Sequence, residues 1–267
     1  MALILSFQGL DAEQGRIEAF SGIESAAGLA RSLTLIAHYV ATGKVRHRFP
    51  FDETYRIYLE STEEGSFNWR LVLLCAGSLA TGLGTNAIYD VTKLVFLKAI
   101  GQEPTELSAP VRDLNENRGG DIDALVEAVE PSLKKGHYGI GNTTSTITIY
   151  ETTTTTKRTL AVFDSQSKSY LSDSVDAETD GQDVAISSLN ANDSTGRAYF
   201  LDLKRTIPFR ISRDADPTTL ITVSKALDRY VNSNPAPIRI TFRRIEAIDG
   251  RLKRIIIFSA EDVSEAL

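Results

Sequence analysis

An uncharged stretch constrains the fold of this chain more than any other feature. Residues 71–89, between Arg70 and Asp90, carry no charged side chain. Because about 20 apolar residues suffice to span a bilayer, the stretch either crosses a membrane or lies inside a folded domain. Three glycines, at 77, 82 and 84, weaken any helix here by about 1 kcal/mol each. We therefore predict a buried strand, a turn of small residues and a helix that ends at Gly101. The alternative is a membrane-active effector that inserts residues 71–89.

The composition is that of an ordinary globular protein, with 42% hydrophobic and 24% charged residues. The single cysteine, Cys75, cannot form an internal disulfide, and the N-terminus lacks the basic start of a signal peptide. We therefore expect a cytoplasmic protein. The net charge is −6, and residues 181–267 carry 13 basic against 11 acidic side chains. This balance is far from that of a dedicated DNA-binding domain.

The clearest helix in the sequence covers residues 21–43. Ser21 followed by Glu24 has the spacing of a capping box, and Gly43 supplies the stop. Apolar residues recur at helical spacing between these signals and predict the buried side of the helix. They are Ile23, Ala26, Ala27, Ala30, Leu33, Ala37 and Val40.

Alternating patterns predict strands on both sides of this helix, near residues 2–9, 55–61 and 67–75. We therefore assign residues 1–110 to a small α/β domain in which one helix covers one face of a sheet. Residues 111–180 are predicted to form a connector. It contains a short helix that begins at Asp121, a hairpin of β-branched residues and an acidic, Ser-rich linker.

Residues 181–267 have the element order of a five-stranded barrel. Three predicted strands, a short helix and a final hairpin follow one another, and Asp249-Gly250 is a strong turn signal in that hairpin. The order β-β-β-α-β-β is that of an OB-type barrel. The prediction for the whole chain is an α+β fold, with a small N-terminal sheet-and-helix domain and a C-terminal five-stranded, OB-like β-barrel.

Motifs of catalysis and metal binding do not occur in the sequence. It holds no Walker loop, no G-x-S-x-G, no H-E-x-x-H and no cysteine pair. His47 and His137 lack sequence neighbours typical of a triad or a metal site. The segment KKGHYGIGN, residues 134–142, allows two interpretations, a phosphate-binding nest or a helix end followed by a loop. We therefore predict a protein that acts by binding, with no cofactor and no metal.

Basic residues gather on the last hairpin. On its first arm Ile238, Ile240 and Phe242 alternate with Arg239, Thr241 and Arg243, which predicts an apolar inner and a basic outer face. A basic face of an OB-type barrel can follow a nucleic-acid backbone, although charges on a strand also protect against aggregation. We consider nucleic acid, a nucleotide, a protein partner and a second copy of the chain as ligands. The candidate contact residues are Arg239, Arg243, Arg244, Arg251, Lys253 and Arg254.

Three segments carry a resemblance to a known family: GIESAAGLARSLTLIAHYVATGKVRHR, EEGSFNWRLVLL and LNANDSTGRAYFLDLKRTIPFRI. Together they resemble a family of uncharacterised bacterial and phage proteins with an α/β N-terminal domain and a five-stranded β-barrel C-terminal domain. The resemblance implies this fold and a setting in phage–host conflict. It implies no activity and no site residue.

Overall fold

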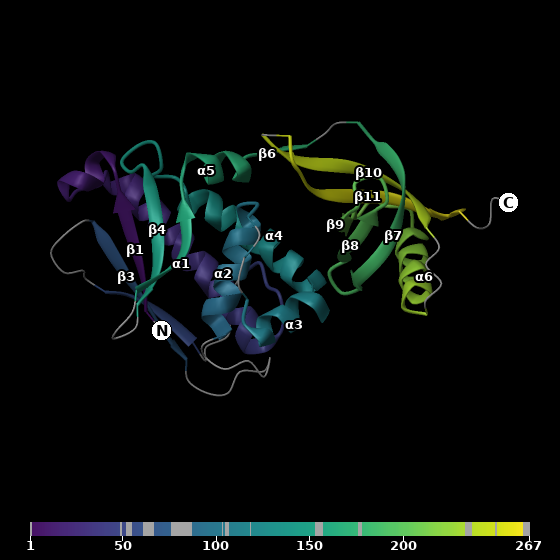
Figure 1. Ribbon diagram of the computed structural model, residues 1–267, viewed down its shortest axis with the longest axis horizontal. Coiled ribbons are helices and arrows are strands. Elements are labelled where there is room, and N and C mark those ends of the chain that lie inside the picture. Colours follow the sequence, from purple (N-terminus) through teal and green to yellow (C-terminus); the bar gives the residue numbers. More distant parts are fainter. Residues whose placement is uncertain are drawn as a thin grey trace. The chain divides into compact units, whose positions relative to one another are not determined.

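A computed structural model gives the fold of the chain (Figure 1). It describes residues 2–48, 50–51, 55–60, 67–75, 87–102, 104, 107–117, 119–152, 157–175, 178–232, 237–248 and 250–263. The chain divides into two compact units: residues 1–115 with 125–171, and residues 116–124 with 172–267. Helices and two separate sheets confirm the predicted α+β class.

The first unit contains a five-stranded sheet in the order β2-β3-β1-β4-β5, in which all neighbours are antiparallel. Its strands are β1 (Ala2–Gln8), β2 (Tyr55–Glu60), β3 (Asn68–Cys75), β4 (Thr146–Thr152) and β5 (Lys157–Phe163). The first three confirm the predicted β-α-β-β unit. The β4–β5 hairpin, which we predicted in a connector, completes this sheet because β4 pairs with β1.

Helices cover the face of the sheet that carries Tyr55 and Phe163. The helices that contact its strands are α1 (Ala19–Thr42), α2 (Ala87–Ala99) and α5 (Ser165–Leu171), and a 3-10 turn η1 (Leu10–Gln14) precedes α1. Between α2 and β4 the chain forms α3 (Ala109–Asn117) and α4 (Gly119–Gly136). The Tyr55 hydroxyl donates to the backbone oxygen of Thr34 in α1 at 3.0 Å. The ring of Phe96 in α2 lies 5.6 Å from that of Phe163 in β5. The predicted linker after β5 instead begins with α5, whose start is fixed by Asp164, which accepts from the Ser167 backbone N–H at 2.8 Å.

The start of α1 differs from the prediction. Glu18 is the N-cap, and its two carboxylate oxygens accept from the backbone N–H groups of Phe20 and Ser21 at 3.0 and 2.7 Å. These hydrogen bonds lower the pKa of the Glu18 carboxyl, because they favour its charged form. The predicted capping box from Ser21 is therefore wrong. Ile23 is also not part of the buried side, since 61% of it is exposed.

The uncharged stretch is not one continuous element. Residues 71–75 are the end of β3, and residues 87–89 are the start of α2. Residues 76–86, where we predicted a small-residue turn, lie outside the described residues. Among those described, the structure has no helix long and apolar enough to cross a membrane.

Glycine allows α1 and α4 to approach backbone to backbone. A Cβ atom placed on Gly28 of α1 would lie 2.4 Å from the backbone nitrogen of Gly136 and 2.5 Å from the carbonyl oxygen of Ser132 in α4. Both obstructing groups are main chain, so no side-chain rotation can relieve the overlap. Gly28 therefore sets the separation of the two helices.

Substitution of Gly28 by alanine should destabilise the first unit by about 2 kcal/mol or more, because the extra methyl group forces the packed helices apart. Urea denaturation followed by circular dichroism measures this loss. Gly120→Ala, in α4 but in the second unit, is the control, since a Cβ atom at this helical position would meet, among the described residues, Ser188 Oγ alone, at 3.6 Å. Equal stability of Gly28→Ala and Gly120→Ala would contradict the proposed close contact.

The second unit contains the predicted barrel. Its strands are β7 (Asp180–Asn190), β8 (Thr195–Phe200), β9 (Arg205–Ile211), β10 (Ile238–Ala247) and β11 (Leu252–Asp262), with α6 (Thr219–Val231) after the third. Neighbouring strands follow the order β11-β9-β8-β7-β10, and a further pairing of β10 with β11 closes the barrel. The pairing of β9 with β11 is parallel. This strand order, with a helix between the third and fourth strands, is that of an OB-type barrel. A short strand, β6 (Asp173–Val175), pairs with the end of β10.

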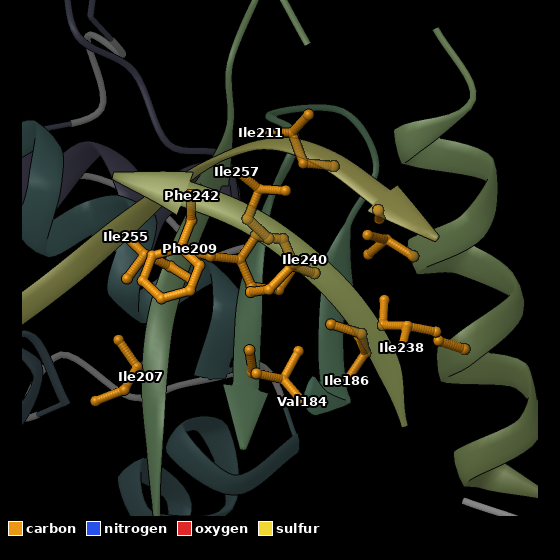
Figure 2. Close-up of a cluster of buried hydrophobic side chains, with 14 of the residues drawn as sticks. Val184, Ile186, Ile207, Phe209, Ile211, Ile238, Ile240, Phe242, Ile255 and Ile257 are labelled. Atoms are coloured by element: carbon orange, nitrogen blue, oxygen red, sulfur yellow. The ribbon is translucent and has the colours of Figure 1, made fainter. Parts of the chain in front are cut away.

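Alternate residues of the barrel strands fill its interior (Figure 2). Ile238, Ile240 and Phe242 of β10 are fully buried, as the alternating pattern predicted. They meet Ile255 and Ile257 of β11, and α6 contributes its buried residues to the same core. The side chains between these positions must therefore point away from the interior.

Candidate functional site

Two of the predicted contact residues form ion pairs with β7. Arg239 lies 3.0 Å from Asp183, and both side chains remain partly exposed. Arg244 contacts the carboxylate of Asp180 and lies 3.9 Å from Glu246. Exposed ion pairs of this kind stabilise a protein by at most about 1 kcal/mol. They nevertheless offset much of the positive charge that Arg239 and Arg244 would offer to a ligand.

Arg243 occupies a different position, on the outer face of the barrel. Its guanidinium lies over the ring of Phe258 at 5.0 Å from the ring centre. In the strand register Arg243 of β10 is opposite Ile256 of β11, and Ile256 is in turn opposite Arg210 of β9. Arg210 and Arg243 are both exposed. We call Arg243, Ile256 and Arg210 the arginine row.

The remaining predicted residues lie near the turn of the hairpin. The backbone oxygen of Arg251 accepts from the Ala247 N–H at 2.9 Å and closes this turn. Lys253 and Arg254 follow in β11, where Arg254 is opposite Ile245. Arg239 is opposite Glu261 at the other end of the hairpin. The six predicted residues thus extend along the whole hairpin and do not form one cluster.

Sequence reasoning missed two arginines of the barrel face. Arg210 belongs to the arginine row. Arg197 of β8 is bound by Asp123, near the start of α4, through Nε to one carboxylate oxygen and through Nη2 to the other at 3.0 Å. Only 20% of the Arg197 side chain and 10% of the Asp123 side chain are exposed. Neither arginine lies in a basic run of the sequence, so only strand pairing could have identified them.

Comparison with known proteins places the chain in a family. Residues 3–172 match the model of a domain of unknown function, DUF7946. The chain belongs to the DUF7946 family. Residues 178–261, which include the barrel strands, match a second family of unknown function, DUF7947. These matches confirm the predicted membership of an uncharacterised family. Neither curated proteins nor solved structures give a match.

In the DUF7946 region a histidine and a serine lie in hydrogen-bonding contact. His137 Nε2 is 3.0 Å from Ser167 Oγ, and Nδ1 is 2.8 Å from the backbone oxygen of Leu133. A neutral ring protonated at Nδ1 donates to Leu133 and accepts from the serine hydroxyl, as in a serine–base pair. However, His137 is fully buried and Ser167 is 3% exposed. The pair therefore connects the end of α4 to α5 and has no access to a substrate.

The segment KKGHYGIGN forms the end of α4 and a tight loop. The Gly139 N–H donates to Ser25 Oγ at 2.9 Å, and the Gly141 N–H donates to the backbone oxygen of Thr144 at 2.8 Å. Because these donors have partners within the chain, the geometry favours the helix-end interpretation over a phosphate nest. The part of the chain that the structure describes contains no group of His, Cys, Asp and Glu residues suited to a metal ion.

The buried histidine should make the first unit sensitive to acid. Burial lowers the pKa of His137 from 6.5 to about 4. The unfolded chain therefore binds the proton more readily, so this contribution to stability is complete above about pH 6.5 and is lost as the pH falls toward 4. We expect a loss of about 2 kcal/mol near pH 5.

Urea denaturation midpoints near neutral pH and near pH 5 test this expectation. His137→Gln should be less stable near neutral pH and should show a smaller decrease on acidification. His47→Gln, which changes an exposed histidine, should retain the wild-type pH dependence. An undiminished acid response in His137→Gln would show that other groups cause it.

Proposed function

We propose that the chain is a non-catalytic binding protein whose barrel contacts single-stranded nucleic acid through the arginine row. The observation that carries this proposal is the register of three neighbouring strands, which puts Arg210 and Arg243 on one outer face with Ile256 between them. OB-type barrels bind oligonucleotides and oligosaccharides on their outer strands and loops. The proposed setting is the cytoplasm, and a role in phage–host conflict stays a prediction.

The spacing of the two arginines suits a flexible polyanion. Neighbouring strands lie about 4.8 Å apart, so the backbones at Arg210 and Arg243 are about 10 Å apart across β11. A planar guanidinium binds a phosphate through two parallel hydrogen bonds. Two such groups at this separation can hold successive parts of one strand while Ile256 contacts a sugar or a base.

The cation–π contact of Arg243 with Phe258 supports a contact with bases. Phe258 is partly exposed, and the Arg243 guanidinium lies over its ring at 5.0 Å from the ring centre, so both groups can meet a ligand at the surface. Bases of single strands stack on aromatic rings and on arginine planes. Arg239 and Arg244 contribute less in this proposal, because Asp183 and Asp180 already bind them.

The double variant Arg210→Ala with Arg243→Ala should weaken binding of a labelled oligo-dT and flatten its salt dependence. Each phosphate contact on a single strand contributes about 0.7 to the slope of log affinity against log salt, so the slope should fall by about 1.4. Fluorescence anisotropy at several salt concentrations measures both quantities.

Arg213→Ala with Lys225→Ala removes the same charge from exposed positions outside the arginine row and is the control. It should retain the wild-type slope. An equal loss of affinity in both double variants would mean that the effect comes from net charge alone. Absence of wild-type binding, together with a 260 nm to 280 nm absorbance ratio of pure protein, would overturn the proposal and favour a protein partner or self-association.

A further inference from the structure

We infer that Arg197 is a further phosphate-binding residue of the same barrel face, and that Asp123 is an internal competitor that occupies it. This inference rests on the proposed function. It assigns a role to the start of α4, which belongs to the same compact unit as the barrel. Two features carry it: the position of Arg197 beside the arginine row, and the way in which the acidic segment holds this side chain.

Arg197 continues the face that the arginine row begins. In the pairing of β8 with β9, Arg197 is opposite Pro208, and Arg210 is opposite Thr195. Arg210 is two residues from Pro208, so its side chain points to the same side of the sheet as those of Pro208 and Arg197. Diagonal neighbours of this kind are about 7–8 Å apart. The positive positions thus run across four neighbouring strands, from Arg243 through Arg210 to Arg197.

Asp123 binds Arg197 as a phosphate would. Both carboxylate oxygens engage the guanidinium, one at Nε and one at Nη2. This two-pronged geometry is the one that arginine uses for carboxylates and phosphates alike. Asp121, two residues earlier, accepts from Asn190 Nδ2 at 2.9 Å and fixes the start of α4 on the β7–β8 hairpin. The Asp123 carboxylate therefore occupies the site that an external anion would need.

The start of α4 leaves one buried polar group of the barrel without a hydrogen bond. The hydroxyl oxygen of Ser188 is buried and has no hydrogen-bond partner within the described residues. Ser188 is opposite Arg197 in the register of β7 and β8, and it faces the backbone of Gly120 in α4. Buried hydroxyl groups normally have a partner, and one without a partner is costly. A phosphate oxygen bound at Arg197 would accept a hydrogen bond from the Ser188 hydroxyl, for which the start of α4 provides no acceptor.

Asp123→Asn in the full-length chain tests the inference. The amide keeps the size of the aspartate but removes its charge, so residue 123 competes less strongly with an external anion for Arg197. We expect the affinity for oligo-dT to rise several-fold and the salt slope to increase by about 0.7, the value for one added phosphate contact. Arg197→Ala in the wild-type background should change neither quantity, and Asp123→Asn with Arg197→Ala should show no gain.

Glu116→Gln is the matched control, because it removes one negative charge from an exposed position of α3, seven residues before Asp123. An equal gain in this variant would mean that only net charge matters. No gain in Asp123→Asn, with a normal loss in the arginine-row double variant, would overturn the inference and leave the proposed function intact. No oligonucleotide binding in any variant would overturn both.

Thermal melting of each variant identifies an unfolded barrel. If Asp123→Asn does not fold, Asn190→Ala replaces it in the test. This change removes the hydrogen bond to Asp121 and leaves the atoms of the Arg197–Asp123 pair in place. A smaller gain in the same direction supports internal competition, and an affinity equal to wild type overturns it.

Discussion

Closure of the barrel is the constraint on which the rest of the second unit depends. Once β10 pairs with β11 and β11 with β9, every strand has two faces with opposite requirements. The inner positions must be apolar, and the outer ones remain for charge. A shift of the register by one residue would bury Arg243 and expose Phe242, so the core itself fixes where the arginines point. The outward direction of these arginines is thus a consequence of packing.

The sequence predicted what depends on local pattern. Alternation along residues 238–242 identified the inner and outer positions of β10 correctly, and the order of elements predicted the barrel. What could not be predicted depends on which strands become neighbours. Arg210 of β9 and Arg197 of β8 are isolated in the sequence, and only the pairing of β9 with β11 and with β8 shows that they share a face. Asp183 and Asp180 likewise compensate arginines from which they are distant along the chain.

The first unit shows the same division between local and distant information. The helix of residues 19–42 was visible from its periodicity, but its cap was not, because a glutamate at Glu18 competes successfully with the more usual serine. The long-range partner of Gly28 was invisible as well. The contact of His137 with Ser167 has the spacing of a catalytic pair, but both side chains are buried in a fully packed interior. Spacing alone therefore does not identify a catalytic site.

The parallel pairing of β9 with β11 has a consequence for how the chain is made. β11 is the last of the five strands to be synthesised, and it supplies the partner for the free edges of both β9 and β10. On the ribosome, β7, β8 and β9 therefore emerge as an open sheet with an apolar side and an unpaired edge. Such intermediates aggregate readily or require chaperones. The edge of β9 can be paired only after residues 252–262 have left the exit tunnel. A translation pause late in the message would therefore prolong the time during which this edge and the apolar side of the sheet are exposed.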